Sequence, residues 1–349
     1  MLTPVARRSR SKPVCSVVIP NYNGRKLLET CLESVDRNRP RNIPIEVIVV
    51  DDASTDDSIA WLAIHHPDVR VVALDRNQGF CAAANAGIAA AKAPYIQLLN
   101  NDTEVCENWI EAGLEPFVDP RIGSVAPLVL VRSDPSRVDS AGDSYAWYGK
   151  PDKRGRGEPA DRFARQGPRL VFGASASSAF YRASALAKIG GFDLSFGSYY
   201  EDVEIAFRLR WAGYRCMFNP RCVIHHEISA SYDHARPELQ RRMARNAEIL
   251  FWTRLPLAWL AASVVPHLAF TLAQATHRAL TGRFRAFALG KIDAIQKIKD
   301  IRFKRSLNRS LALSAIARPH FPIQILPFAD PIDRLPRNPE PASPLRKSK

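Results

Sequence analysis

The feature that most constrains the fold of this sequence is the regular alternation, in its N-terminal third, of short apolar runs with segments of helical spacing. Buried strands are predicted at runs that are rich in valine and isoleucine and bounded by turn residues: 14–19, 45–50, 69–74 and 95–99. Helices are predicted between them, at about 25–35, 59–64 and 80–91, and the run 54–57 is expected to cap the second. This order is typical of an α/β fold in which a parallel sheet carries helices on both faces.

Polar residues follow three of these predicted strands at the point where each strand ends. Ligands of such sheets bind beyond the carboxyl ends of the strands. We therefore expect a ligand site at this edge, formed by Pro20, Asn21, Asn23, Asp51, Asp52, Asn100, Asn101 and Asp102. The sequence has no GxGxxG after the first predicted strand and no GxxxxGK[ST], which argues against a dinucleotide fold and a P-loop.

The acidic members of these runs have more than one interpretation. Asp51 and Asp52 could hydrogen-bond a base and a ribose, or cap the next helix, although Ser54 can already fill the capping role. Asp102, beside two amides, suits a hard divalent cation that shares its remaining positions with waters and phosphate oxygens. The alternative for Asp102 is an Asx turn that caps a helix starting near Glu107.

Two later motifs carry groups that can accept protons or bind a metal. Glu201 and Asp202 open a predicted helix, where unpaired amide groups favour the ionised carboxylate and keep a general base available. Simple helix capping is the alternative. His225 and His226 end a short predicted strand, and only one of them can face a given site because adjacent side chains of a strand point to opposite faces.

The order of the motifs gives the chain a family resemblance. The series VVIPNYN at 17–23, VVDDASTD at 49–56, NQGF at 77–80 and LLNND at 98–102 is followed by GGFD at 190–193, YEDVE at 200–204 and RWAGY at 210–214. This series resembles family 2 glycosyltransferases, and within them the bacterial rhamnosyltransferase-like enzymes of cell-surface polysaccharide assembly. The resemblance covers about residues 14 to 246.

The resemblance implies a GT-A fold followed by C-terminal helices, and a metal-dependent inverting glycosyltransferase that uses Mg²⁺ or Mn²⁺. The implied donor is a nucleotide-diphosphate sugar (dTDP- or UDP-linked, with GDP left open), and the subgroup suggests rhamnose as the sugar. The implied acceptor is a saccharide or a lipid-linked saccharide. The alternative is a non-catalytic, membrane-associated scaffold on the same fold, which would have no need for both Asp102 and the Glu201–Asp202 pair.

The resemblance also implies residue roles. Asp202, with Glu201 beside it, corresponds to the general base that takes the proton of the acceptor hydroxyl. Asp102 and His226 correspond to metal ligands, with His225 as the second choice for the histidine. Donor binding is implied for Pro20, Asn21, Asn23, Asp51, Asp52, Asn77, Gly79, Asn100, Asn101 and Arg245.

Two positions depart from the family pattern. Asn100 stands where a strict DxD motif has its first aspartate, so one anionic ligand is missing. Glu204 stands where the family more usually has aspartate, which leaves the role of that position open.

The C-terminal part of the sequence predicts contact with a membrane. Residues 255–275 carry no formal charge and are long enough to span a bilayer, but Pro256, Pro266 and His267 weaken that interpretation. Residues 278–309 place apolar side chains among basic ones, as an interfacial amphipathic helix does, at Leu289, Ile292, Ile295, Ile298 and Phe303. We expect peripheral attachment to the cytoplasmic face, with a single span, or a soluble helical domain or dimer contact, as the alternatives.

The net charge of +14 lies in three segments, at 1–13, 278–309 and 334–349, and leaves the rest of the chain near neutral. Basic ends beside an apolar segment fit an anionic membrane better than a nucleic acid, for which basic residues would cover the working face.

The expected organisation is a basic disordered start at 1–13, a glycosyltransferase domain at 14–235 with a long loop at 133–168, and a helical membrane-associating region at 236–317. A disordered proline-rich tail is expected at 318–349. Six scattered cysteines and no visible secretory signal fit a cytoplasmic protein, and the oligomeric state stays open.

Overall fold

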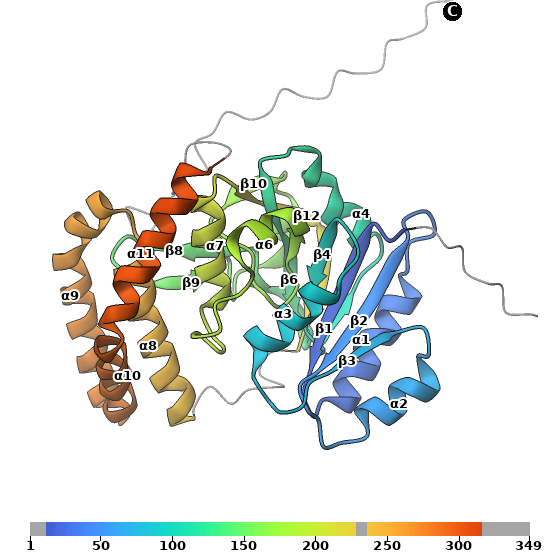
Figure 1. The fold of residues 1–349 in the computed structure, drawn as a ribbon, viewed down its shortest axis with the longest axis horizontal. Helices are drawn as coiled ribbons and strands as arrows, with labels where there is room; N and C mark the ends of the chain where they lie inside the picture. The colour runs from blue at the N-terminus through green and yellow to red at the C-terminus, as the bar shows by residue number, and fades with distance from the viewer. Residues whose placement is uncertain (1–11, 228–235, 316–349) are drawn as a thin grey trace, which may run out of the picture.

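The strands of the protein form one large mixed sheet and a two-stranded ribbon (Figure 1). The computed structural model describes residues 12–227 and 236–315, so the expected disordered ends lie almost wholly outside the described residues. The described strands are β1 Cys15–Asn21, β2 Ile45–Asp51, β3 Arg70–Ala73, β4 Tyr95–Leu98, β5 Thr103–Val105, β6 Ile122–Val131, β7 Asp134–Ser140, β8 Asp143–Tyr145, β9 Pro151–Lys153, β10 Arg169–Val171, β11 Phe180–Arg182 and β12 Arg215–His226.

The helices cover both faces of the sheet and form a separate layer at its C-terminal side (Figure 1). They are α1 Arg25–Arg37, α2 Ser58–His65, α3 Phe80–Ala90, α4 Trp109–Leu114, α5 Ala160–Ala164, α6 Ala183–Ile189, α7 Glu201–Trp211, α8 Pro237–Arg254, α9 Leu257–Leu280, α10 Phe284–Gln296 and α11 Ile298–Leu313, with a 3₁₀ turn at Glu115–Val118.

The strand order of the large sheet is β10-β12-β6-β11-β4-β1-β2-β3, with β5 paired to β12 and β7 to β6. Strands β4, β1, β2 and β3 are parallel, as predicted. The expectation of a wholly parallel sheet is wrong, however, because β11 runs antiparallel to both of its neighbours, β4 and β6. The α/β fold class is confirmed, and the sheet is mixed.

The continuous apolar runs of β1 and β2 arise because both faces of these strands are covered. Val17 and Ile19 pack into one hydrophobic cluster and Val18 into another, in keeping with the alternation of side chains along a strand. Gly87 lets α3 approach this sheet closely, because a β-carbon there would lie 2.2 Å from Val18 Cγ1.

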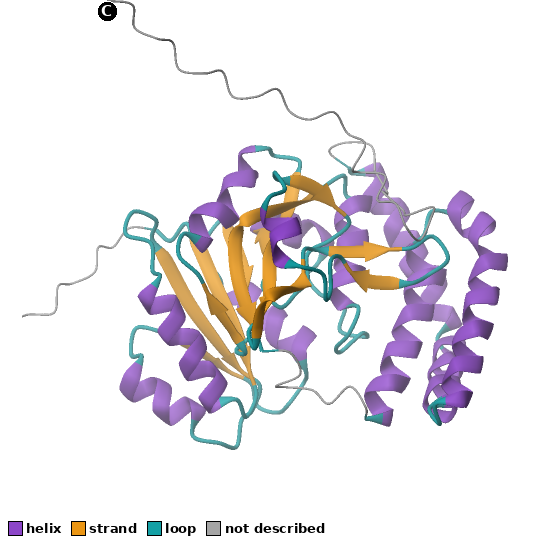
Figure 2. Ribbon diagram, turned by 180° about the vertical axis from the view of Figure 1, so that it is seen from behind, coloured by secondary structure: helices purple, strands orange, loops and turns teal. Residues whose placement is uncertain are grey.

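The C-terminal helices share a core with the sheet domain rather than standing apart from it. Ile249, Leu250 and Phe251 of α8 belong to the same buried cluster as Val203 and Phe207 of α7. The β8–β9 ribbon lies between the large sheet and this helical layer (Figure 2).

Several local expectations are corrected by the structure. The segment 133–168, predicted as a long loop, contains β7, β8, β9 and α5, which are short and carry no sustained apolar period. The two strands expected at 216–218 and 222–226 are one strand, β12, with a shift in its register to β6 between Asn219 and Val223. Ser54 does not cap α2, because that helix begins at Ser58, whose backbone N–H and hydroxyl donate to Asp56.

The region expected to meet the membrane also differs in detail. The apolar helix begins only at Leu257, after Pro256, and the single amphipathic helix expected at 278–309 is divided into the end of α9, α10 and α11. Of the predicted apolar positions, the side chain of Ile298 lies outside the described part, Leu289 is half-buried, and exposed side chains occur at Ile292, Ile295 and Phe303.

Candidate active site

A cleft of about 550 Å³ lies where the carboxyl ends of β1, β2 and β4 meet the start of α7. It collects most of the side chains that the sequence singled out. The predicted residues that line it are Pro20, Asn21, Asp52, Asn77, Gly79, Asn100, Asn101, Asp102, Glu201, Asp202 and His226.

Three predicted donor-binding residues, Asn23, Asp51 and Arg245, lie outside this lining, and the first two brace the loops that form it. The side-chain oxygen of Asn23 accepts a hydrogen bond from the Thr55 N–H at 2.7 Å. The buried carboxylate of Asp51 accepts from the Ser54 N–H at 2.8 Å and from the Asn21 amide at 3.2 Å. These hydrogen bonds hold the loops at the rim of the cleft.

The sheet end of the cleft is a network of amides and a carboxylate. Asp52 accepts hydrogen bonds from the backbone N–H groups of Gln78 at 2.7 Å and Gly79 at 2.8 Å. Gly79 has a φ of +83°, a conformation in which an L side chain is strained. The Asn101 amide donates to Asn21 at 2.8 Å. The loop after β3, which carries Asn77, is thus fastened to the end of β2.

His226 faces Asp102 across the middle of the cleft. Its Nε2 lies 3.3 Å from Asp102 Oδ1, and its Nδ1 lies 2.9 Å from Asp139 Oδ2 of β7. This contact follows from the register of β12 on β5, which pairs His226 with Thr103. Burial lowers the pKa of the His226 imidazole, but its hydrogen bonds to Asp102 and Asp139 outweigh that effect and raise the pKa to about 9. His225, the second choice, does not line the cleft.

Asp102 and His226 fit a divalent cation whose remaining coordination positions are filled by waters and by the phosphate oxygens of a bound molecule. Among the described residues no group of three or more His, Cys, Asp or Glu is arranged to hold a metal by itself. The carboxylate oxygen and imidazole nitrogen are nevertheless adjacent, and both are donors that Mn²⁺ accepts. Asp139 orients the imidazole from behind, as the carboxylate partners of metal-binding histidines do, and its other oxygen, Oδ1, is buried without a hydrogen bond from any described residue. The other interpretation of Asp102, an Asx turn that caps a helix starting near Glu107, is wrong, because β5 follows Asp102 and α4 begins only at Trp109.

The opposite side of the cleft carries three carboxylates, Asp143, Glu201 and Asp202. Burial raises the pKa of each of them, and the charge of Asp202 raises that of Asp143 and Glu201 further. Hydrogen bonds from backbone N–H groups, including that of Val203 at 2.8 Å, oppose the effect of burial on Asp202. Lys153, which donates to Asp139 at 2.7 Å, provides positive charge between the two ends of the cleft.

The loop before α7 is held by the predicted residue Arg245 and its neighbour Asn246. The Arg245 guanidinium donates to the carbonyls of Ser195 and Phe196, and the Asn246 amide donates to that of Tyr199 at 2.8 Å. Tyr199 and Tyr200 both have left-handed backbone, with φ of +69° and +65°. Arg245 does not line the cleft, and its contacts hold this strained entry to the helix.

The far side of α7 is fixed by buried charges around Glu204. This carboxylate pairs with Arg208 of its own helix and with Arg254 of α8, both at 2.5 Å. Arg208 also donates to the Ile189 carbonyl at 2.6 Å. The role of position 204, which the sequence left open, is therefore to join α7 to the helical layer.

Sequence reasoning missed the residues that β7, the β8–β9 ribbon and the segment after β10 add to the cleft. They are Asp139, Asp143, Asp152, Lys153, Arg156, Ser175, Ala176 and Ser177. All but the last three fall in the segment predicted as a loop, and short polar strands of this kind have no hydrophobic period that would have revealed them.

Comparison with known proteins identifies the family of the chain. The family model described as Glycosyl transferase family 2 matches residues 16–190, half of the chain. The chain is 29% identical over 244 residues to a pre-mycofactocin glycosyltransferase of Mycobacterium tuberculosis, covering 66% of this chain and only 45% of that relative. It is 27% identical over 279 residues to the N-acetylglucosaminyl-diphospho-decaprenol L-rhamnosyltransferase of the same organism, covering 70% of this chain and 88% of that relative.

A solved structure has the same fold. The mannosyltransferase PcManGT of Pyrobaculum calidifontis, in complex with GDP-Man and Mn²⁺, superimposes with a TM-score of 0.52 at 21% identity, over 87% of this chain and 86% of that one. Together with the family match, this confirms the GT-A fold with C-terminal helices and favours the enzyme over a non-catalytic scaffold. The chain belongs to glycosyl transferase family 2.

Proposed function

We propose that this chain is a metal-dependent inverting glycosyltransferase that moves a sugar from a nucleotide-diphosphate donor to a saccharide carried on a lipid. The observation that carries the proposal is the arrangement of one cleft, in which Asp102 and His226 face the carboxylates of Glu201 and Asp202. This places a metal-binding pair and a candidate base on opposite sides of the space that a donor and an acceptor would share.

The donor end is assigned to the polar strand ends. Asn21, Asp52 and Asn101 offer acceptors and donors for a base and ribose, and Asp102 and His226 would hold Mg²⁺ or Mn²⁺. When bound, such a cation offsets the charge that develops on the leaving diphosphate. Rhamnose remains the preferred sugar, because the rhamnosyltransferase of M. tuberculosis matches this chain over most of its length.

Asp202 is assigned as the general base, with Glu201 beside it. Its carboxylate lies at the first turn of α7 and lines the cleft. Burial raises the pKa of the Asp202 carboxyl above its usual value, and a higher pKa makes the carboxylate a stronger base. Inversion requires one base and no protein nucleophile, so the acceptor hydroxyl loses its proton to Asp202 as it attacks the anomeric carbon.

Nucleotide binding tests the donor site. Purified protein is heated with UDP, dTDP or GDP, each with and without Mn²⁺, and the melting temperature is compared with that of Asp102→Ala. We expect one nucleotide to raise the melting temperature only when Mn²⁺ is present, and this rise to disappear in the variant. A folded wild-type protein that responds to none of the nucleotides would contradict the proposed donor site.

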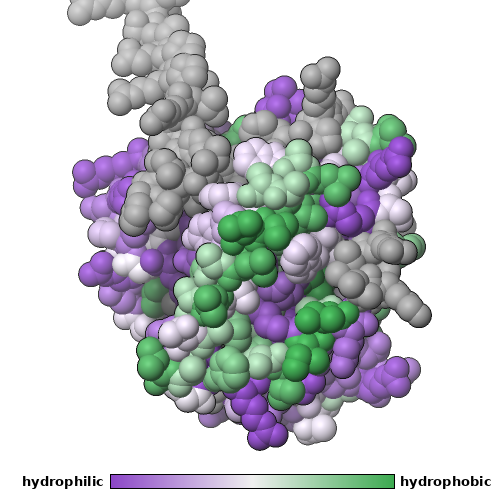
Figure 3. All heavy atoms as spheres, turned by 90° about the vertical axis from the view of Figure 1, so that its left-hand side faces the viewer, coloured by the Kyte–Doolittle hydropathy of each residue, from purple (hydrophilic) through white to green (hydrophobic). Residues whose placement is uncertain are grey.

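A lipid-linked acceptor is supported by the exposed apolar face of α9. Its described outer side chains include Val265, which is 75% exposed, and Leu272, which is 70% exposed. Figure 3 shows hydrophobic residues gathered on the side of the molecule where α9 lies in Figure 1. We assign this face to a bilayer surface, because a helix with one exposed apolar face rests at a membrane interface with that face turned toward the acyl chains.

We infer that α9 lies along the membrane rather than across it. The helix is long and apolar enough to span a bilayer by length and composition. Its middle, however, is fastened to the protein by the buried His267, whose Nε2 lies 3.1 Å from Glu248 of α8 and whose Nδ1 lies 2.9 Å from the Tyr148 carbonyl. A spanning helix would leave these polar partners facing lipid, at a high cost in free energy. This supports peripheral attachment to the inner face of the cell membrane.

Vesicle flotation tests this attachment. The wild-type protein should float with vesicles of phosphatidylcholine and phosphatidylglycerol and be released by alkaline carbonate, which leaves spanning proteins in place. A Val265→Ser/Leu272→Ser double variant should lose flotation, while Val118→Ser, at a residue 88% exposed on the sheet domain, should retain it. Equal flotation of both variants would contradict the role of α9.

A further inference from the structure

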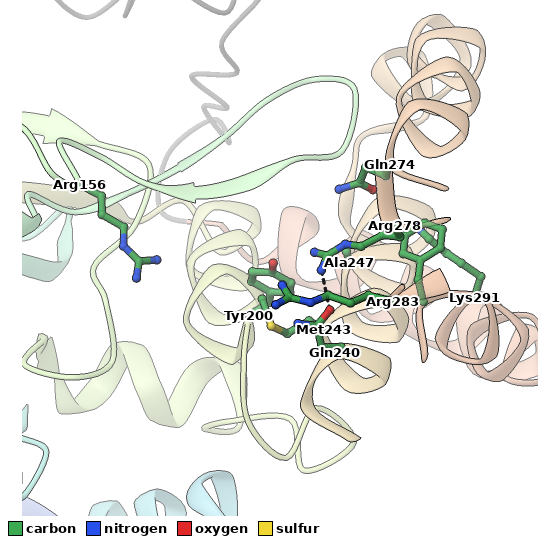
Figure 4. A pocket seen from close by; sticks show the side chains of 11 residues that line it. Arg156, Tyr200, Gln240, Met243, Ala247, Gln274, Arg278, Arg283 and Lys291 are labelled. Atoms are coloured by element: carbon green, nitrogen blue, oxygen red, sulfur yellow. Dashed lines mark hydrogen bonds between the residues drawn. The ribbon is translucent and has the colours of Figure 1, made fainter. Parts of the chain in front are cut away.

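A second cavity, of about 520 Å³, opens beside the reaction cleft (Figure 4). It lies between the loop after β9, the start of α7 and the helices α8, α9 and α10. Its lining includes Arg156, Tyr200, Met243, Arg278, Arg283 and Lys291.

The lining of this cavity is strongly basic. Four of the described lining residues are cations, and none of them is an aspartate or a glutamate. Lys291 is paired with Glu248, and Arg278 donates to the Gln240 side chain at 2.5 Å (dashed line in Figure 4). The guanidinium groups of Arg156 and Arg283 have no hydrogen-bond or ion-pair partner within the described part of the chain. The cavity thus has cationic donors that no described residue satisfies.

The cavity is joined to the reaction cleft at one side. Arg156, Tyr200 and Met243 line both spaces, and Tyr200 directly precedes the carboxylates of Glu201 and Asp202. On the other side, Gln274 and Arg278 belong to α9, the helix with the exposed apolar face. A ligand in the cavity would therefore lie between that face and the candidate base.

The charges of the two spaces are opposite. The lining of the cleft has seven aspartates and glutamates against three lysines and arginines, so a diphosphate there is favoured by a cation that offsets part of this charge. The second cavity offers arginine donors instead, which bind phosphate oxygens in pairs of parallel hydrogen bonds. A metal-free diphosphate is favoured there and disfavoured in the cleft.

We propose that this cavity binds the diphosphate of the lipid-linked acceptor, with Arg156, Arg278 and Arg283 as its ligands. This inference rests on the proposed function and assigns the acceptor side of the same site. The diphosphate lies in the basic cavity, the attached sugar passes Tyr200 toward Asp202, and the lipid leaves along α9.

Binding of a lipid diphosphate without divalent metal tests the assignment. Calorimetry in EDTA compares farnesyl diphosphate with farnesol, inorganic pyrophosphate and phosphatidylglycerol vesicles. The variant is Arg278→Gln/Arg283→Gln, and the matched control is Arg285→Gln, an exposed arginine of α10 that does not line the cavity. The wild-type protein and the control should bind farnesyl diphosphate and pyrophosphate, and the double variant should bind both at least about tenfold more weakly.

Other results would overturn the proposal. Unchanged affinity of the double variant for farnesyl diphosphate, or equal affinity of the wild type for farnesol, would show that these arginines do not bind the diphosphate. A loss confined to phosphatidylglycerol vesicles would make the cavity a headgroup site instead. The nucleotide-dependent rise in melting temperature with Mn²⁺ should persist in the double variant, which shows that it is folded. A wild-type protein that binds farnesyl diphosphate but responds to no nucleotide would support this site and contradict the proposed donor site alone.

Discussion

Arg254 of α8 pairs with the buried Glu204 of α7 at 2.5 Å, and this contact joins the helix that begins with Glu201 and Asp202 to the C-terminal helices. Arg254 also donates to Asn308 of α11 at 2.7 Å. Asp193, in the loop before α7, pairs with Lys304 of α11. The candidate base therefore lies on a helix, α7, whose far side and preceding loop form ion pairs with α8 and α11.

Substitution of Glu204 should destabilise the whole protein. Glu204→Gln leaves both Arg208 and Arg254 buried without their carboxylate, and we expect a loss of about 3 kcal/mol or more in the free energy of unfolding. The matched control is Glu29→Gln, because Glu29 pairs with Arg25 at the surface and should contribute below about 1 kcal/mol. Urea unfolding measures both, and similar losses for the two variants would contradict the structural role of Glu204.

The contact between α8 and α9 should depend on pH. Burial raises the pKa of Glu248, but its hydrogen bond to His267 and the charge of Lys291 outweigh burial and lower the pKa to about 2. A lowered pKa in the folded state adds stability that is present above the unfolded pKa, near 4.5, and is lost as pH falls toward 2. Glu248→Gln should therefore unfold more easily than the wild type at pH 7, and the difference should shrink as the pH falls below about 4.5. A difference that stays constant over this range in urea titrations would contradict the assignment.

Gly290 sets how closely α10 can approach α8. A β-carbon at this position would lie 2.2 Å from the Arg241 carbonyl oxygen and 2.8 Å from the Ala244 β-carbon. Gly290→Ala should therefore lower stability by about 1–3 kcal/mol, although alanine is the better helix former. Gly167→Ala, where a β-carbon meets nothing within 4 Å, is the control. Thermal unfolding that ranks the two variants equally would show that the helices can separate without cost.

Glu201 and Asp202 can be told apart by kinetics. Asp202→Asn should lower kcat by roughly 10²–10⁴-fold and leave nucleotide binding intact, because the variant keeps its shape and loses its proton acceptor. Glu201→Gln should have a smaller effect on kcat if Asp202 is the base. Single-turnover transfer rates and nucleotide-induced melting shifts measure the two properties separately, and the reverse ranking would assign the base to Glu201.

Asp139 should control metal affinity through His226 without binding the metal itself. Asp139→Asn weakens the orientation of the imidazole, so the Mn²⁺ concentration that gives half-maximal activity should rise about 10–100-fold. Asp134→Asn, in an exposed part of the same strand, should change it little. We expect Asp139→Asn to regain full activity at saturating Mn²⁺. An unchanged metal requirement would show that Asp139 does not act through His226.

The parallel strands and the polar residues at their ends could be predicted because their sequence signals are local. Apolar runs such as 45–50 mark strands buried on both faces, and the position of Asp52 or Asp102 follows directly from the strand that precedes it. The ordered motifs also placed Glu201 and Asp202 at a helix start, where the structure has them.

The remaining features depend on contacts between distant parts of the chain. Asp139 reaches His226 only because β7 pairs with β6, and no periodicity in its polar sequence predicts that pairing. The antiparallel strand β11 is three residues long, too short for its pattern to indicate direction. The family resemblance implies donor binding for Arg245, but sequence order cannot show that its guanidinium donates to the carbonyls of the loop before α7.

The attachment of α7 has a consequence for which acceptors can react. Asp202 is connected through Glu204 and Arg254 to α8, and α8 is connected through Glu248 and His267 to the apolar helix α9. With α9 resting on a bilayer, these buried contacts fix the height of the base above the lipid surface. The distance of the base from the bilayer would then be constant. An acceptor would be selected by the height of its hydroxyl above the lipid surface as well as by the identity of its sugar.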